Sequence, residues 1–157
     1  MKTTLILVFL FCSVAPHVSA QQSKPNLTGT WNLNLNKSKL APQHGPGSDR
    51  YKIKHSEPRV EMEHTFNGRS ETYSYVTDGK ERMANGSLQD GATRAKAYWD
   101  SDTLVLEKHQ ATRPGGFVWI SRYTLSQDGK SLAVIHHANK SSFSAAFDES
   151  LVYEQQH

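Results

Sequence analysis

Apolar and polar residues alternate one by one along much of the chain, and the clearest stretch spans residues 29–36. There Trp31, Leu33 and Leu35 alternate with three asparagines. A period of two is typical of an antiparallel strand that buries one face and exposes the other. Gly29 stands where the chain enters this strand, and a glycine there allows another backbone to come close. We therefore predict that Trp31 plugs one end of a β-structure.

The same alternation returns repeatedly, interrupted by turn-forming dipeptides such as Asn67-Gly68 and Asp128-Gly129. Asn-Gly between two alternating runs is a strong hairpin signal. No helix is expected, and the segment 37–49 is too rich in proline and glycine to hold one. The predicted fold is all-β, an antiparallel up-and-down meander closed into a barrel of about 8–10 strands, since closure removes exposed edges. Strands are expected at 29–36, 51–56, 60–66, 71–77, 82–84, 93–99, 104–106, 117–125, 132–135 and 143–154.

The first 20 residues differ from this pattern. Lys2 precedes an apolar run from Leu5 to Phe11, and Val18-Ser19-Ala20 forms a small-residue cleavage site. This organisation is typical of a secretory signal peptide and is too short for a spanning helix. Lipid attachment at Cys12 would need small residues before it, and bulky ones stand there. We predict a signal peptide at 1–20, a single domain at 21–157, and export to the periplasm or the medium.

Cleavage after Ala20 would remove the only cysteine, so the mature chain would hold no disulfide. It would also remove Lys2, so that 18 basic residues fall to 17 against 15 acidic ones. This small net charge, without a run of basic residues, argues against nucleic-acid binding. We expect a monomer that does not insert into membranes.

Histidines are the richest candidates for chemistry. His55 and His64 share strand faces with apolar residues, and His136-His137 places one imidazole on each face of its strand. Two or three inward imidazoles could bind a metal or a haem iron. Alternatively, these histidines sit in a half-wet barrel mouth or in the core. No histidine spacing typical of metal ligands occurs, so we predict no metal and no cofactor.

Catalytic arrangements are also missing from the sequence. Glu61 and Glu63 would lie roughly 7 Å apart on one strand face, but that face is the polar one opposite Met62, where carboxylates are solvated. The chain has no Gly-x-Ser-x-Gly nucleophile elbow and no phosphate-binding loop. The sequence therefore predicts a protein that is not an enzyme.

Five short motifs stand out along the chain: Gly29 to Leu33 with Lys37-Ser38, Thr77 to Lys80, Trp99 to Leu104, Leu125 to Leu132, and Leu151 to Glu154. They resemble motifs of the lipocalin and fatty-acid-binding superfamily, and most of all those of its small exported bacterial members. The resemblance covers nearly all of the predicted mature chain and implies a lipocalin-like barrel. The chain departs from the fatty-acid-binding proteins in two ways. The segment after its first strand is too short for their helical lid. Its last strand reads Leu151-Val152-Tyr153, where those proteins have an Arg-x-Tyr pair that holds a carboxylate.

Two functions are compatible with such a barrel. The first is a non-enzymatic carrier that binds a small hydrophobic molecule in its interior; the second is a protein-interaction barrel, such as a bacterial barrel-type protease inhibitor, which also opens with Gly-x-Trp. We favour the carrier, because Ala95 and Ala97 would face Trp119 and Tyr123 across the interior and leave a gap. The candidate ligand-binding residues are Trp31, Met62, His64, Tyr73, Tyr75, Ala95, Ala97, Trp99, Trp119 and Tyr123.

Overall fold

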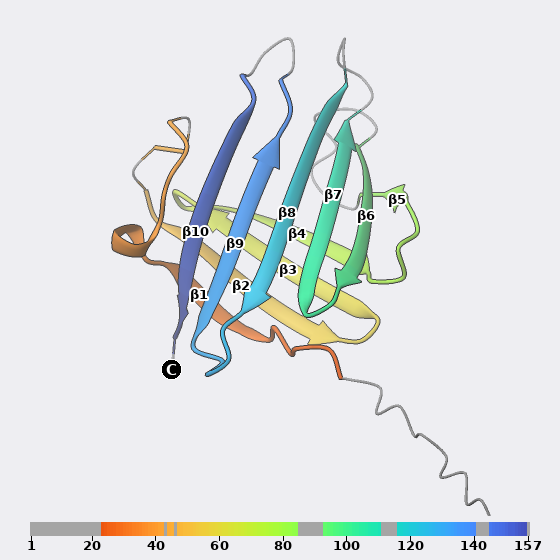
Figure 1. The fold of residues 1–157 in the computed structure, drawn as a ribbon, viewed down its shortest axis with the longest axis horizontal. Coiled ribbons are helices and arrows are strands. Elements are labelled where there is room, and N and C mark those ends of the chain that lie inside the picture. Colours follow the sequence, from red (N-terminus) through yellow and green to blue (C-terminus); the bar gives the residue numbers. More distant parts are fainter. Residues whose placement is uncertain are drawn as a thin grey trace, which may run out of the picture.

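The chain folds into one antiparallel sheet that curls on itself (Figure 1). The computed structural model describes residues 23–42, 44–45, 47–84, 93–110, 116–140 and 145–156. Within these residues it contains ten strands and one short 3₁₀ turn, η1. The predicted all-β, up-and-down meander is therefore confirmed. The elements are β1 (Gly29–Leu33), η1 (Leu35–Lys37), β2 (Asp49–Ser56), β3 (Arg59–Phe66), β4 (Arg69–Val76), β5 (Arg82–Met83), β6 (Thr93–Asp100), β7 (Thr103–Gln110), β8 (Phe117–Leu125), β9 (Ser131–Ala138) and β10 (Phe147–Gln155).

The first and last strands meet in the middle of the sheet. The strand order is β4-β3-β2-β1-β10-β9-β8-β7-β6-β5, so β1 pairs with both β2 and β10. Figure 1 shows the two halves crossing, with β6 to β10 in front of β1 to β4. The two ends of the sheet approach each other between β4 and β6, where the Gly79 N–H donates to the Ala97 carbonyl over 2.9 Å. We call this approach of β4 to β6 the seam. The two strands contact each other there but are not joined by a ladder of backbone hydrogen bonds.

The predicted strand at 29–36 is wrong beyond Leu33. The Asn34 side chain accepts hydrogen bonds from the backbone N–H groups of Asn36 and Lys37, and this turns the chain into η1. Local bonds of this kind compete with a strand ladder. Leu35 is consequently 48% exposed and does not share the buried face of Trp31. The chain rejoins the sheet at Lys39, which pairs with Ser150 of β10.

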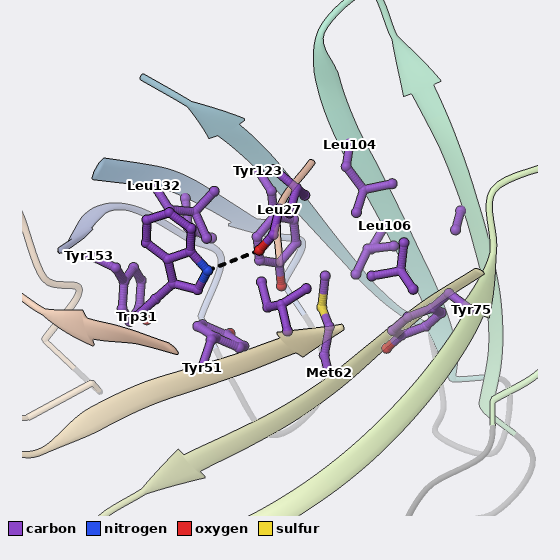
Figure 2. Close-up of a cluster of buried hydrophobic side chains, with 14 of the residues drawn as sticks. Leu27, Trp31, Tyr51, Met62, Tyr75, Leu104, Leu106, Tyr123, Leu132 and Tyr153 are labelled. Atoms are coloured by element: carbon purple, nitrogen blue, oxygen red, sulfur yellow. Dashed lines mark hydrogen bonds between the residues drawn. The ribbon is translucent and has the colours of Figure 1, made fainter. Parts of the chain in front are cut away.

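The apolar core fills the end of the barrel that carries the turns 57–58 and 101–102. We call it the closed end. Trp31 is 1% exposed, and its indole Nε1 donates to the Leu27 carbonyl over 3.0 Å (Figure 2). Its predicted role as a plug agrees with this position. The other fully buried large side chains are Leu27, Ile53, Val60, Met62, Leu104, Val105, Leu106, Leu132, Val134, Leu151 and Tyr153.

Candidate functional site

A polar layer lies on the inner face above the apolar core. Its buried members are Asp49 of β2, Ser121 of β8, His136 of β9 and Glu149 of β10. The ladder explains how they meet, because His136 is paired with Ser121 on one side and with Glu149 on the other. Buried polar groups need hydrogen-bond partners to avoid a large desolvation penalty. The partners of each group therefore define the chemistry of the layer.

Both buried carboxylates are satisfied by histidines. Asp49 accepts hydrogen bonds from His64 Nε2 over 2.8 Å and from the Tyr153 hydroxyl over 2.9 Å. His44, in the segment before β2, places Nδ1 at 2.9 Å from Glu149 Oε2 and Nε2 at 3.5 Å from Asp49 Oδ2. The imidazole thus lies between two buried carboxylates and ties its own segment to β10.

His136 belongs to a neutral chain of hydrogen bonds. The Trp119 indole N–H donates to Ser121 Oγ over 2.8 Å, and Ser121 Oγ lies 2.8 Å from His136 Nδ1. Burial is the main cause that lowers the pKa of His136 to about 3. At neutral pH this ring therefore carries no charge, and its Nδ1 shares a hydrogen bond with the Ser121 hydroxyl.

Lys108 is the inward-facing cation of this layer. In the ladder it is paired with Ala95 on one side and with Trp119 on the other. Its Nζ lies 3.9 Å from the centroid of the Tyr73 ring, which comes from β4 across the seam. Burial lowers the pKa of Lys108 to about 8, against a smaller opposite influence of Glu71. The ammonium is therefore still mostly protonated at neutral pH.

Aromatic rings line the opposite, open end of the inner face. Trp119 packs against Phe147 with ring centroids 5.1 Å apart and against Phe117 with centroids 6.1 Å apart. Phe66 of β3 packs edge-on against His44 at 5.2 Å. The strand register places all of these rings on the face that is buried at the closed end, yet each ring is half-buried. The inner face is thus accessible to solvent at this end.

The ten predicted ligand-binding residues divide into three groups. Trp31, Met62, Tyr75, Ala95, Ala97 and Tyr123 belong to the buried core. Trp99 lies at the closed end, where its indole N–H donates to Glu57 Oε1 over 2.6 Å. His64, Tyr73 and Trp119 lie half-buried in the polar layer or at its rim. Of the ten, these last three are therefore the ones that stay partly accessible on the inner face outside the closed end.

The predicted gap beside the alanines is wrong. Strands β6 and β8 both pair with β7, so Ala95 and Ala97 lie in the same half of the sheet as Trp119 and Tyr123 and do not face them. Ala97 is 2% exposed and Ala95 is 6% exposed. A void large enough for water would leave accessible surface on these side chains. The alanines instead belong to the filled core cluster that also contains Tyr75 and against which Tyr73 packs.

The sequence reasoning missed Asp49, Glu149, Lys108 and His44. A signal existed for the first three, because each stands in phase with the apolar residues of its strand, as Lys108 does with Leu104 and Leu106. In a sequence, a charged residue at the end of an alternating run is interpreted as part of a loop or of the surface unless the strand is known to continue past it. His44 lies in an irregular segment where no periodicity predicts its direction.

The four histidines singled out in the sequence, His55, His64, His136 and His137, each take part in a hydrogen bond within the fold. His55 accepts the Leu27 N–H at Nδ1 over 3.3 Å, and its Nε2 lies 2.8 Å from Glu57. Across the described residues, no group of three or more His, Cys, Asp or Glu side chains is arranged to hold a metal ion. A search of the same residues finds no helix of the length and apolarity that a membrane span requires.

Solved structures resemble this fold closely, although their sequences do not. Lipid binding protein 8 from Caenorhabditis elegans superposes with a TM-score of 0.63 at 7% identity, covering 83% of this chain and 95% of that chain. Secretory abundant heat soluble protein 4 from Ramazzottius varieornatus gives 0.63 at 15% identity, covering 87% and 99%. Fatty-acid-binding protein 1 from Echinococcus granulosus gives 0.60 at 10% identity, covering 83% and 97%.

The chain has the fold of the lipocalin and fatty-acid-binding barrels. At these identities the likeness concerns the fold alone. No family model and no curated protein sequence matches the chain. The sequence-based resemblance to this superfamily is confirmed at the level of architecture, including the curled ten-strand meander.

Proposed function

We propose that this protein is a non-enzymatic carrier that binds a small hydrophobic molecule at the open end of its barrel. The observation that carries the proposal is the partial exposure of Phe117, Trp119 and Phe147 on the inner face. Aromatic rings that face inward but stay accessible form an apolar surface that a ligand can cover. Proteins with the same fold whose names describe fatty-acid or lipid binding support this proposal.

Tryptophan emission offers a test, because the three tryptophans report on different places. Trp119 lies at the proposed site, whereas Trp31 and Trp99 lie at the closed end. An environment-sensitive apolar dye should bind at about micromolar levels and quench the emission, as expected when a ligand covers a few hundred Å² of apolar surface. The quenching should be lost in Trp119→Phe and kept in the matched control Trp99→Phe.

The reverse outcome would contradict this location. Quenching that persists in Trp119→Phe and disappears in Trp99→Phe would place the dye outside the open end. Absence of dye binding to the wild type would refute the carrier function and favour the alternative function as a protein-interaction barrel. The described residues give that alternative no specific support, because their exposed large apolar side chains (Leu35, Met83 and Ile135) lie on η1, β5 and the outer face of β9.

The proposed carrier acts outside the cytoplasm as a monomer. The motive is the signal-peptide pattern of residues 1–20. Mass spectrometry of the protein from the periplasm or the culture medium should find a chain that begins at Gln21. A chain that still begins at Met1, recovered only from the cytoplasm, would contradict export. Sedimentation at micromolar concentration should give a mass near that of one chain.

A further inference from the structure

Lys108 is a partly buried cation of the inner face that forms no ion pair with the described residues. Within the described part of the chain its ammonium donates no hydrogen bond and forms no ion pair, and its contact is the face of Tyr73. The two buried carboxylates of the inner face are matched: Asp49 has His64, and Glu149 has His44. Glu71, whose charge raises the pKa of Lys108, forms no ion pair with it and accepts a hydrogen bond from the Tyr73 hydroxyl.

An unpaired ammonium in such a place costs stability. Removal of a charge from water is unfavourable unless a partner compensates it, and a cation–π contact compensates only in part. Lys96, on the outward face of the neighbouring strand β6, shows the usual solution, because its Nζ lies 3.3 Å from Glu107 Oε2. An ionisable side chain that has a shifted pKa, no ion pair and an accessible surface beside it is a candidate binding site, because a ligand of opposite charge would stabilise it. The missing partner is an anion.

The surroundings of Lys108 limit the size of such an anion. Below it the core is full, because Met62 and Leu106 are each 2% exposed and Val134 is fully buried. Above it the side chains of Trp119, Phe117 and Phe147 are half-buried and reachable. A long alkyl chain therefore finds no channel toward the closed end, whereas a flat ring system can pack against Trp119.

We propose that Lys108 pairs with the carboxylate of a compact aromatic acid whose ring packs on Trp119, and that long-chain fatty acids are poor ligands. This inference rests on the proposed carrier function and adds the ligand class to it. The carboxylate of the ligand accepts a charge-assisted hydrogen bond from the Lys108 ammonium. The ring covers the aromatic surface of the open end and stays outside the filled core.

Calorimetric titration with three named probes tests the ligand class. 2-Naphthoate should bind the wild type at least tenfold more tightly than its neutral analogue 2-naphthamide and at least tenfold more tightly than palmitate. In Lys108→Gln the affinity for 2-naphthoate should fall to within about twofold of that for 2-naphthamide. The matched control Lys96→Gln, from the neighbouring strand, should keep the wild-type preference. A tenfold change in affinity corresponds to about 1.4 kcal/mol.

A second measurement separates binding from folding. Because Lys108 is unpaired, Lys108→Met should melt at a temperature equal to or above that of the wild type without ligand. A variant that melts clearly lower would show that the ammonium has a structural partner and would overturn the inference. Equal affinity of the wild type for 2-naphthoate and 2-naphthamide would overturn it too, as would palmitate binding as tightly as 2-naphthoate. In these cases the apolar dye still binds, whereas failure of the carrier function removes dye binding as well.

Discussion

Trp31→Ala is predicted to be the most damaging single substitution at the closed end. The indole is 1% exposed, lies among Leu27, Tyr153 and Leu132, and donates a hydrogen bond to the Leu27 carbonyl (Figure 2). Truncation of a buried tryptophan to alanine costs about 3–5 kcal/mol through lost contacts and the cavity left behind. The lost hydrogen bond adds about 1 kcal/mol, because a buried carbonyl is left without its donor. The total of about 4–6 kcal/mol is a large fraction of the stability of an ordinary domain.

Urea unfolding followed by circular dichroism measures this loss. The midpoint should fall strongly while the slope of the unfolding free energy stays the same. Trp31→Phe keeps an aromatic ring but cannot donate the hydrogen bond, so it should lose less than half as much. Trp99→Ala, at the half-exposed tryptophan of the same end, serves as the control and should cost about 1 kcal/mol. A Trp31→Ala variant within 1 kcal/mol of the wild type would show that the indole does not hold the closed end together.

Three further predictions concern pH and cofactors. Burial would raise the pKa of Glu57, but hydrogen bonds from Thr77, His55 and Trp99 outweigh it and lower the pKa. The ionised Glu57 carboxylate therefore stabilises the fold above the ordinary pKa of a glutamate, and this stabilisation is lost as the pH falls through the lowered pKa. Glu57→Gln should consequently lose less stability than the wild type between pH 5 and pH 3. Thermal melting at each pH measures the difference. The affinity for 2-naphthoate should fall as the pH rises through about 8, because Lys108 loses its proton there, and Lys108→Gln should show no such fall. A strong chelator or a reductant should leave the melting midpoint of the mature protein unchanged, whereas a fall of several degrees with chelator would revive the metal interpretation of the histidines.

The positions of most strands could be predicted because alternation is a local property. The runs around Ile53, Met62 and Val134 each bury one face, and the structure places strands on all three. The prediction failed at Leu35, where Asn34 offered the backbone an alternative set of hydrogen bonds. An alternation rule contains no information about that competition, because it counts side-chain polarity and not side-chain acceptors.

Long-range pairing was outside the reach of the same reasoning. The expectation that Ala97 faces Trp119 across the interior required knowledge of which strands lie opposite each other. The pairing of β1 with β10 divides the sheet into two halves and puts both residues in one of them. The same division brings Tyr73 from the other half over Lys108. The candidate site depends on this encounter, so periodicity could suggest its residues singly but not their arrangement.

Strand β7 contributes both to the filled core and to the proposed binding layer. Leu106 and Lys108 are successive inward residues of β7, yet Leu106 is buried among the core and Lys108 lies in the accessible layer. Leu106→Ala should therefore destabilise the protein by about 2–5 kcal/mol and change the affinity of the folded protein for 2-naphthoate by less than twofold. Lys108→Gln should do the opposite, weakening binding at least tenfold without lowering the melting temperature. If both variants lost stability and affinity together, the closed and open ends would form one cooperative site, and the division of the inner face into a core and a binding layer would be wrong.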